Sequence, residues 1–158
     1  MTNQDKTVLV TGGSGFIATH CILKLAAAGY KIKSTVRNLD RVSDLNKILD
    51  EAGSTYERLN KIDVDWVSAD LTKDEGWSEA VKGCDYVMHV ASPVALEEPK
   101  DENDLIVPAR EGTLRVIKAA NEEGVKKIVL TSSVAAIIYG HEKDLSLIHI
   151  SEPTRQSL

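Results

Sequence analysis

Residues 6–18 read KTVLVTGGSGFIA, and this stretch decides the fold. Its first part, Lys6–Thr11, is a short apolar run rich in β-branched residues, which is typical of a buried strand. It leads directly into glycines. From Phe16 to Ala28 apolar residues return at helical spacing, and Gly29 follows where such a helix would end. The stretch therefore predicts a strand, a tight glycine turn and a helix in immediate succession.

The remainder of the chain repeats this alternation. The further predicted strands are residues 30–37, 64–69, 85–91 and 126–132, and the further predicted helices are residues 41–51, about 77–81, and 108–123. Strands that alternate with helices at this interval predict right-handed βαβ crossovers. We therefore expect an α/β fold of the Rossmann type, a doubly wound parallel sheet with helices on both faces, incomplete within this chain.

Length, composition and charge narrow the class of protein. A chain of 158 residues holds one domain, and its contents of 42% hydrophobic and 27% charged residues are those of ordinary soluble proteins. The net charge of −5 argues against nucleic acid and membrane as partners, and no apolar run approaches the length of a bilayer span. The N-terminus lacks a signal-peptide pattern, so we expect a cytoplasmic protein. Cys21 and Cys84 lie far apart in apolar runs, which indicates buried thiols in a reducing compartment.

The spacing of small residues in the glycine turn indicates a phosphate site. Gly12, Gly15 and Ala18 follow one another at intervals of three. Gly12 permits the tight turn, Gly15 lets a pyrophosphate approach the backbone, and Ala18 lets the helix pack closely on the sheet. The phosphates would then meet the free N–H groups and the positive dipole end of the helix. The residues that we assign to dinucleotide binding here are Gly12, Gly13, Gly15, Phe16 and Ile17.

The end of the second predicted strand usually selects between the two nicotinamide cofactors. An acidic residue there binds the ribose and favours NAD, whereas an arginine accepts the 2′-phosphate of NADP. Arg37 ends this strand, and Arg41 follows one helical turn later. Because a guanidinium matches the geometry of a phosphate, we predict that both arginines bind NADP(H). Asp40, the acid nearby, is predicted to cap the second helix instead.

The ordered motifs resemble those of the extended short-chain dehydrogenases/reductases, which include NAD-dependent epimerases and dehydratases. TGGSGFIA (residues 11–18) resembles their glycine turn, and SADL (68–71) resembles their adenine-contacting Asp-Leu. HVASP (89–93) and DLIVPAREGTLRVIKAA (104–120), with a proline in the first turn of its helix, are similar to one branch. That branch is the dihydroflavonol-reductase-like group of NADPH-dependent aldehyde and ketone reductases. TSSVAA (131–136) is similar to the strand end that carries their catalytic serine.

This resemblance covers about residues 6–144 and implies an oxidoreductase acting on a carbonyl or alcohol group. In such enzymes hydride passes from NADPH to the carbonyl carbon of a small-molecule substrate, here an aldehyde, ketone or dihydroflavonol-like compound. A tyrosine protonates the oxygen, a lysine lowers the pKa of that tyrosine, and a serine orients the carbonyl. Ser133 matches the serine. The further cofactor-binding residues that the resemblance implies are Asp70, Leu71, Val90, Ala91, Ser92, Thr131 and Ser132.

Tyr139 and Lys143 have the Y-x-x-x-K spacing of the catalytic pair, but their setting differs from it. The catalytic pair must lie one turn apart on a long helix. Tyr139 follows Ser133 by a short loop, and Gly140 after it disfavours a helix interior. The dipeptide Tyr139-Gly140 resembles a Tyr-Gly pair that follows the serine-bearing strand in this superfamily. We therefore predict that the spacing is accidental and that the catalytic pair lies further downstream.

Residues 145–158, LSLIHISEPTRQSL, read differently from the rest of the chain. Leu145–Arg155 are what a transposase-adapter sequence used in preparing DNA libraries encodes. We therefore expect residues 1–144 to be the NADP-binding domain of a longer enzyme, present here as an N-terminal fragment. Residues 145–158 are expected to be a translated adapter tail. On this hypothesis the chain as written binds NADPH weakly or not at all and reduces nothing.

Two other functions stay open on the sequence. One is a nucleotide-sugar epimerase or dehydratase of the same superfamily that retains NAD, and Arg37 argues against it. The other is a non-catalytic NADP-binding protein, which only the downstream sequence distinguishes. His20 and His89 are interpreted as packing or hydrogen-bonding residues, since no metal-ligand spacing is present. The sequence specifies neither the individual substrate nor an oligomeric state.

Overall fold

A computed structural model describes residues 3–57, 59–93 and 101–134. Tyr139, Lys143 and the predicted tail 145–158 lie outside these residues. The strands are β1 Thr7–Val10, β2 Lys31–Val36, β3 Val64–Ser68, β4 Tyr86–His89 and β5 Lys127–Leu130; the α-helices are α1 Phe16–Ala27, α2 Val42–Ala52, α3 Trp77–Val81 and α4 Asn103–Glu122. Short turns of 3₁₀-helix at Asn3–Asp5 and Leu39–Arg41 and a π-helical turn at Gly53–Glu57 complete the elements.

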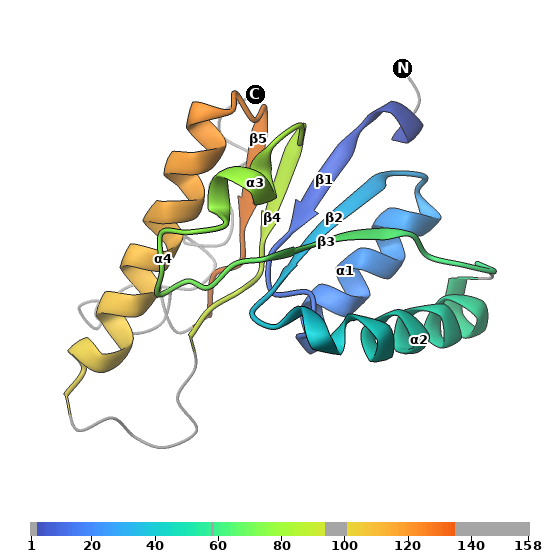
Figure 1. Cartoon of the computed structure of the whole chain (residues 1–158), viewed down its shortest axis with the longest axis horizontal. Coiled ribbons are helices and arrows are strands. Elements are labelled where there is room, and N and C mark those ends of the chain that lie inside the picture. The colour runs from blue at the N-terminus through green and yellow to red at the C-terminus, as the bar shows by residue number, and fades with distance from the viewer. Residues whose placement is uncertain (1–2, 58, 94–100, 135–158) are drawn as a thin grey trace, which may run out of the picture.

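The five strands form one parallel sheet in the order β3-β2-β1-β4-β5 (Figure 1). The chain moves outward from β1 to β3, and then returns to the other side of β1 for β4 and β5. This topology confirms the predicted doubly wound sheet. The winding direction reverses between β1 and β4, and in open α/β sheets ligands bind at the carboxyl ends of the strands beside such a reversal.

Helices cover both faces of the sheet, as the alternation of strands and helices predicts (Figure 1). Neighbouring residues of β1 point to opposite faces because side chains alternate along a strand. Leu9 belongs to a core with α3 and α4, and Val10 belongs to a second core with α1 and α2. Both residues are fully buried, so β1 is the centre of the domain.

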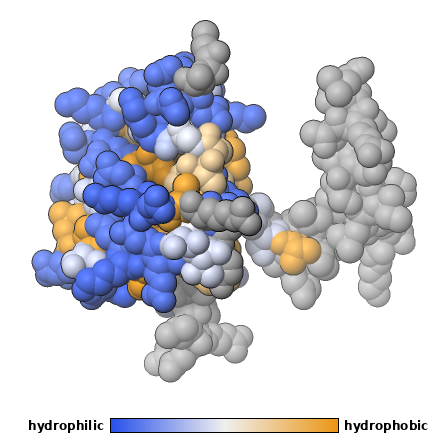
Figure 2. Space-filling model, turned by 90° about the vertical axis from the view of Figure 1, so that its right-hand side faces the viewer, coloured by the Kyte–Doolittle hydropathy of each residue, from blue (hydrophilic) through white to orange (hydrophobic). Residues whose placement is uncertain are grey.

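The surface on the side of α1 and α2 carries mostly charged and polar residues (Figure 2). Figure 2 shows the side of α1 and α2, where hydrophilic residues dominate and hydrophobic residues form smaller patches between them. Within residues 3–57, 59–93 and 101–134, none of the helices combines the length and the apolar character that a membrane crossing requires.

Helix α4 begins five residues earlier than predicted. Its first residue is Asn103, whose backbone N–H donates to the carboxylate of Asp101 at 2.8 Å. Pro108 therefore lies inside the helix, and the expectation of a proline in the first turn is wrong. Because proline has no N–H, the helix lacks one internal hydrogen bond at this point. The aspartate in the preceding turn starts the helix regardless of the proline.

Two smaller expectations also need correction. Asp40 does not cap α2: the side chain of Asn38 accepts from the N–H of Asp40 at 2.8 Å and starts the short 3₁₀ turn before that helix.

Cys84 is buried, and this burial raises the pKa of its thiol to about 11. Cys21 is only partly buried, because it lies at the border of the apolar stripe of α1.

Lys33 is a charged side chain in the interior of the sheet, with an exposed fraction of only 6%. Its Nζ donates to the carbonyl oxygens of Glu79 at 2.6 Å and Lys82 at 3.3 Å, and the Asp65 carboxylate lies 3.9 Å away. These carbonyls belong to the C-terminal end of α3, where a helix leaves acceptors without internal partners. The buried ammonium is therefore satisfied, and it ties α3 to β2.

Asp85 joins three strands at the amino-terminal edge of the sheet. One carboxylate oxygen accepts from the N–H of Thr7 at 3.0 Å, and the other accepts from Lys6 at 3.2 Å and Lys126 at 2.6 Å. The hydrogen bond from Lys126, followed by those from Thr7 and Lys6, holds the pKa of this carboxyl well below its usual range. Asp85 therefore connects the starts of β1, β4 and β5.

The substitution Asp85→Asn should lower the free energy of unfolding at neutral pH. Because the folded-state pKa is depressed, the contribution of Asp85 is complete above the usual carboxyl pKa of about 4 and is lost as the pH falls below it. Urea unfolding at pH 7 and pH 3 should therefore show a difference between wild type and variant that shrinks in acid. Asp44→Asn, which removes an exposed ion pair within α2, is the control. A difference that stays constant over this range would contradict the prediction.

Candidate functional site

A cleft of about 670 Å³ opens at the carboxyl ends of the strands, beside the reversal between β1 and β4. Its walls come from the residues that follow β1, β2, β3 and β4 and from the first turn of α1. The predicted site residues that line it are Gly12, Gly15, Phe16, Ile17, Arg37, Asp70, Leu71, Val90, Ala91 and Ser92. Segments from four separate parts of the chain thus meet in one site.

The glycine turn forms the floor of this cleft. Gly12 has a positive φ of 73°, a conformation that residues other than glycine rarely adopt. Its carbonyl accepts a hydrogen bond from the N–H of Gly15 at 2.9 Å. A Cβ on Gly12 would lie 3.0 Å from the Cβ of Ala91, so the two strand ends approach as closely as a glycine allows. Gly15 caps α1 without a side-chain hydrogen bond. The N–H groups of the first turn of α1 therefore face the cleft with no side chain capping them.

Gly13 points away from the cleft. A Cβ at this position would lie 2.2 Å from the Oγ of Ser34 and 2.5 Å from the ring of Trp66, both on the neighbouring strands. Its N–H donates to the carbonyl of Thr35 at 2.8 Å. Gly13 thus packs the turn onto the sheet rather than lining the site.

Thr11 ties the turn to the end of β4. Its fully buried hydroxyl oxygen accepts from the N–H groups of Val90 and Ala91, each at 3.0 Å, and lies 2.8 Å from Nδ1 of His89. Because the two amides occupy both lone pairs, the hydroxyl hydrogen must go to His89. Nδ1 is then the acceptor and Nε2 carries the proton, 3.5 Å from the hydroxyl of Thr113 on α4. Burial lowers the pKa of His89, which favours this neutral ring.

The end of β2 places Arg37 at the cleft, whereas Arg41 does not line the cleft that the described residues form. The hydroxyl of Thr35, one of the last residues of β2, accepts from the N–H of Gly12 at 3.0 Å. This contact fixes the distance between the strand end and the glycine turn. Arg37 is exposed and adds a positive charge at the rim of the site.

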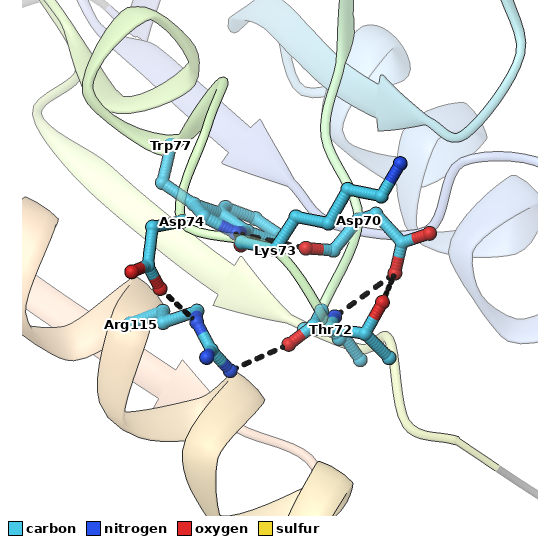
Figure 3. A network of polar contacts seen from close by, with 7 residues as sticks. Asp70, Thr72, Lys73, Asp74, Trp77 and Arg115 are labelled. Carbon is cyan, nitrogen blue, oxygen red and sulfur yellow. Dashed lines mark hydrogen bonds and ion pairs between the residues drawn. The ribbon is translucent and has the colours of Figure 1, made fainter.

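Asp70 follows β3 on the opposite wall, and its turn is drawn in Figure 3. One carboxylate oxygen accepts from the N–H and from the hydroxyl of Thr72, each at 2.9 Å. The amide of Thr72, then its hydroxyl, and then the charges of Arg37 and Lys73 lower the pKa of Asp70. Asp70 is therefore an anionic acceptor near the positive charge of Arg37.

Thr131, Ser132 and Ser133 follow β5, beside the end of β4. The N–H of Thr131 donates to the carbonyl of His89 at 3.0 Å, which extends the pairing of the two strands. All three residues are exposed, and none lines the cleft that the described residues form. The structure thus places them at the same edge of the sheet as the cleft without bringing them into it.

Sequence reasoning missed part of the lining. The unpredicted residues include Ser14, Thr35, Val36, Ala69, Thr72, Trp77, Pro93 and Leu105. Ser14, Val36, Ala69 and Pro93 are immediate neighbours of predicted residues, so extending each motif by one position would have found them. Trp77 and Leu105 come from α3 and α4, and no local pattern connects them to the site. Among the described residues, no group of His, Cys, Asp or Glu side chains could hold a metal ion.

Comparison with known proteins agrees with this geometry. Residues 9–155 match the 3-beta hydroxysteroid dehydrogenase/isomerase family. The chain is 40% identical over 138 residues to dihydroflavonol 4-reductase of Hordeum vulgare, covering 87% of this chain and 37% of that protein. It is 37% identical over 133 residues to an anthocyanidin reductase of Vitis vinifera, covering 84% and 37%. The chain therefore spans less than two fifths of these relatives' length.

Two solved structures have folds similar to that of this chain. Gre2 of Candida albicans, solved in complex with NADPH, aligns with a TM-score of 0.68 and 28% identity over 83% of this chain and 38% of that one. UDP-glucose 4-epimerase of Bifidobacterium longum, solved with NAD⁺ and UDP, aligns with a TM-score of 0.66 and 28% identity over 90% and 41%. The predicted resemblance to short-chain dehydrogenases/reductases and to the dihydroflavonol-reductase branch is thereby confirmed.

The substitution Thr11→Val should destabilise the domain by about 2 kcal/mol, because it leaves two backbone N–H groups and the Nδ1 of His89 without their partner. Thr11→Ser keeps the hydroxyl and should retain most of the stability. Urea unfolding of the three proteins measures both effects. Equal stability of the valine and serine variants would show that the hydroxyl does not hold the end of β4.

Proposed function

The chain belongs to the 3-beta hydroxysteroid dehydrogenase/isomerase family, and from that premise we propose that it carries the cofactor-binding part of an NADPH-dependent oxidoreductase. The cleft would hold the adenosine and pyrophosphate of NADP(H), and the reaction would be reduction of a small carbonyl compound. The observation that carries this proposal is the glycine turn, where Gly12, Ala91 and the first turn of α1 leave a backbone cradle open to a pyrophosphate.

The position of each wall supports one orientation of the dinucleotide. The N–H groups at the start of α1 would bind the pyrophosphate, because they carry partial positive charge and meet no side-chain cap. Asp70 and Leu71, across the cleft, would hold the adenine, with the Asp70 carboxylate as acceptor. Val90, Ala91 and Ser92 would direct the rest of the cofactor along the carboxyl ends of β4 and β5.

Arg37 is the basis for preferring NADP(H) over NAD(H). It lines the cleft at the end of β2, where the adenosine ribose would lie. A guanidinium binds a phosphate with two parallel charged hydrogen bonds, which a ribose hydroxyl cannot match. Arg41, which is predicted to share this role, lies one turn further along the chain and is not among the described residues that line the cleft. We therefore assign the 2′-phosphate mainly to Arg37.

The chemistry of the proposed reaction is divided between the cofactor and the chain. NADPH, when bound, would supply the hydride, and the proton that completes the alcohol would come from the tyrosine that the family resemblance implies. The hydroxyl of Ser133, at the carboxyl edge of the sheet, would hydrogen-bond the carbonyl oxygen of the substrate and orient it. Aldehydes, ketones and dihydroflavonol-like compounds are the proposed substrate class, in keeping with the dihydroflavonol and anthocyanidin reductases among the relatives.

An NAD-dependent epimerase or dehydratase is the second candidate, because the epimerase of Bifidobacterium longum has nearly the same fold similarity as the NADPH-bound reductase. The affinities of this chain for NADPH and for NAD⁺, measured in titrations with ligand-observed NMR as the readout, separate the two functions. We expect weak but measurable NADPH binding, at least tenfold tighter than that of NAD⁺. Tighter binding of NAD⁺ would favour the epimerase, and binding of neither would show that this chain does not form the proposed dinucleotide site.

The substitution Arg37→Met should remove most of the preference for 2′,5′-ADP over 5′-ADP, on the order of tenfold, because the 2′-phosphate loses its charged partner. Arg41→Met is the matched control on the neighbouring turn and should change the ratio less than twofold. Both affinities can be measured by the same titration. If Arg41→Met has the larger effect, Arg37 is not the residue that reads the 2′-phosphate.

A further inference from the structure

Side chains of α3 and α4 hold the turn that would contact the adenine in its shape. Residues 70–74 connect β3 to the segment before α3, and the side of the turn formed by Asp70, Leu71 and Thr72 lines the cleft. Backbone carbonyls of this turn accept hydrogen bonds from side chains of α3 and α4. The carbonyls of Asp70 and Lys73 accept from the indole N–H of Trp77 at 3.2 and 3.1 Å. Trp77 is itself buried in the core of α3 and α4.

Arg115 of α4 holds the rest of the turn (Figure 3). Its Nη1 donates to the carbonyl of Leu71 at 2.9 Å, and its Nε donates to the carboxylate of Asp74. One guanidinium therefore bridges two residues of the turn that lie three positions apart. The planar fork of arginine reaches both acceptors at once, which the single ammonium of a lysine does not do with the same geometry.

Gly112, one helical turn before Arg115, sets how closely α4 approaches. A Cβ at this position would lie 2.8 Å from the Cβ of Leu71 and 3.1 Å from its carbonyl oxygen. The helix thus contacts the turn through its backbone, and Arg115 reaches the turn without extending far from the helix. The side chain of Arg115 is 27% exposed, so its hydrogen bonds are partly shielded from water.

We infer that Arg115 is a positioning residue for the adenosine end of the dinucleotide site. Arg115 is not among the described residues that line the cleft, and we infer that it acts through the turn that does line it. With the guanidinium in place, Leu71 and Asp74 are fixed to α4, and Asp70 is presented toward the cleft. Without it, the turn keeps the hydrogen bonds from Trp77 but loses those to α4, so the wall can move away from the adenine. This inference rests on the proposed dinucleotide site.

The test separates the two ends of the site with two probes. The ligand 2′,5′-ADP reports the adenosine end, and inorganic pyrophosphate reports the glycine turn. The variant Arg115→Met keeps the aliphatic stem and removes the hydrogen bonds. We expect it to weaken binding of 2′,5′-ADP about tenfold, as loss of charge-assisted hydrogen bonds predicts, and to leave pyrophosphate binding within twofold. A purely structural role would weaken both probes alike.

Arg110→Met is the matched control, because Arg110 lies on the same helix, is exposed, and pairs only with its neighbour Glu111 among the contacts described. It should change neither affinity more than twofold. Asp74→Asn provides a milder change: its exposed carboxylate is one of the two acceptors of Arg115, and 2′,5′-ADP binding should weaken about twofold to threefold. The double variant Arg115→Met/Asp74→Asn should bind 2′,5′-ADP no more weakly than Arg115→Met alone, because both substitutions remove the same contact between Arg115 and Asp74.

The outcomes distinguish this inference from the proposed function. If wild type binds neither probe, the dinucleotide site itself is refuted. If wild type binds both probes and Arg115→Met binds 2′,5′-ADP normally, Arg115 does not position the turn. Equal weakening of both probes would likewise reject a specific role at the adenosine end. If Arg115→Met unfolds, the effect of Asp74→Asn on the two probes decides the question.

Discussion

The hydroxyl of Thr11 joins the two strands between which the cleft opens. It accepts from two successive amides after β4 and donates to His89, so the end of β1 and the end of β4 share one buried oxygen. This contact brings Gly12 against Ala91. The floor of the cleft, the start of α1 and the wall after β4 all take their positions from this junction. Because the oxygen is buried, its partners have no water to replace it.

The remaining walls of the cleft are loops whose backbone groups are hydrogen-bonded by side chains from neighbouring strands and helices. The hydroxyl of Thr35 holds the N–H of Gly12, while Trp77 and Arg115 hold the carbonyls of the turn after β3. In each case a side chain from a strand or helix fixes a loop that lines the cleft. The cleft-facing side chains are thereby left available to a ligand. A site built in this way is shaped before any ligand binds.

Much of this arrangement follows from local sequence. The alternation of β-branched runs and helical periodicity placed all five strands and four α-helices of the described residues, and the glycine spacing located the floor of the cleft. Two of the errors fell where two local signals compete. Pro108 marked a helix start that Asp101 already provides, and Asp40 was read as a cap that Asn38 supplies. The sequence pattern cannot show which of two neighbouring residues caps a helix, because the candidate capping residues stabilise a helix by similar free energies.

The sequence by itself determined the fold class, the order of the motifs and the residue types that a dinucleotide site requires, since these depend on spacing along one segment. Only the tertiary structure decided which of them share a cleft. Gly13 turns into the sheet, and Arg41 is not among the described residues that line the cleft. Trp77 and Arg115 hold a turn that lies far from Arg115 along the chain. The physical reason is that such contacts depend on how closely helices pack on the sheet. The distance between Gly112 and Leu71 sets that approach, and no pattern within either segment records it.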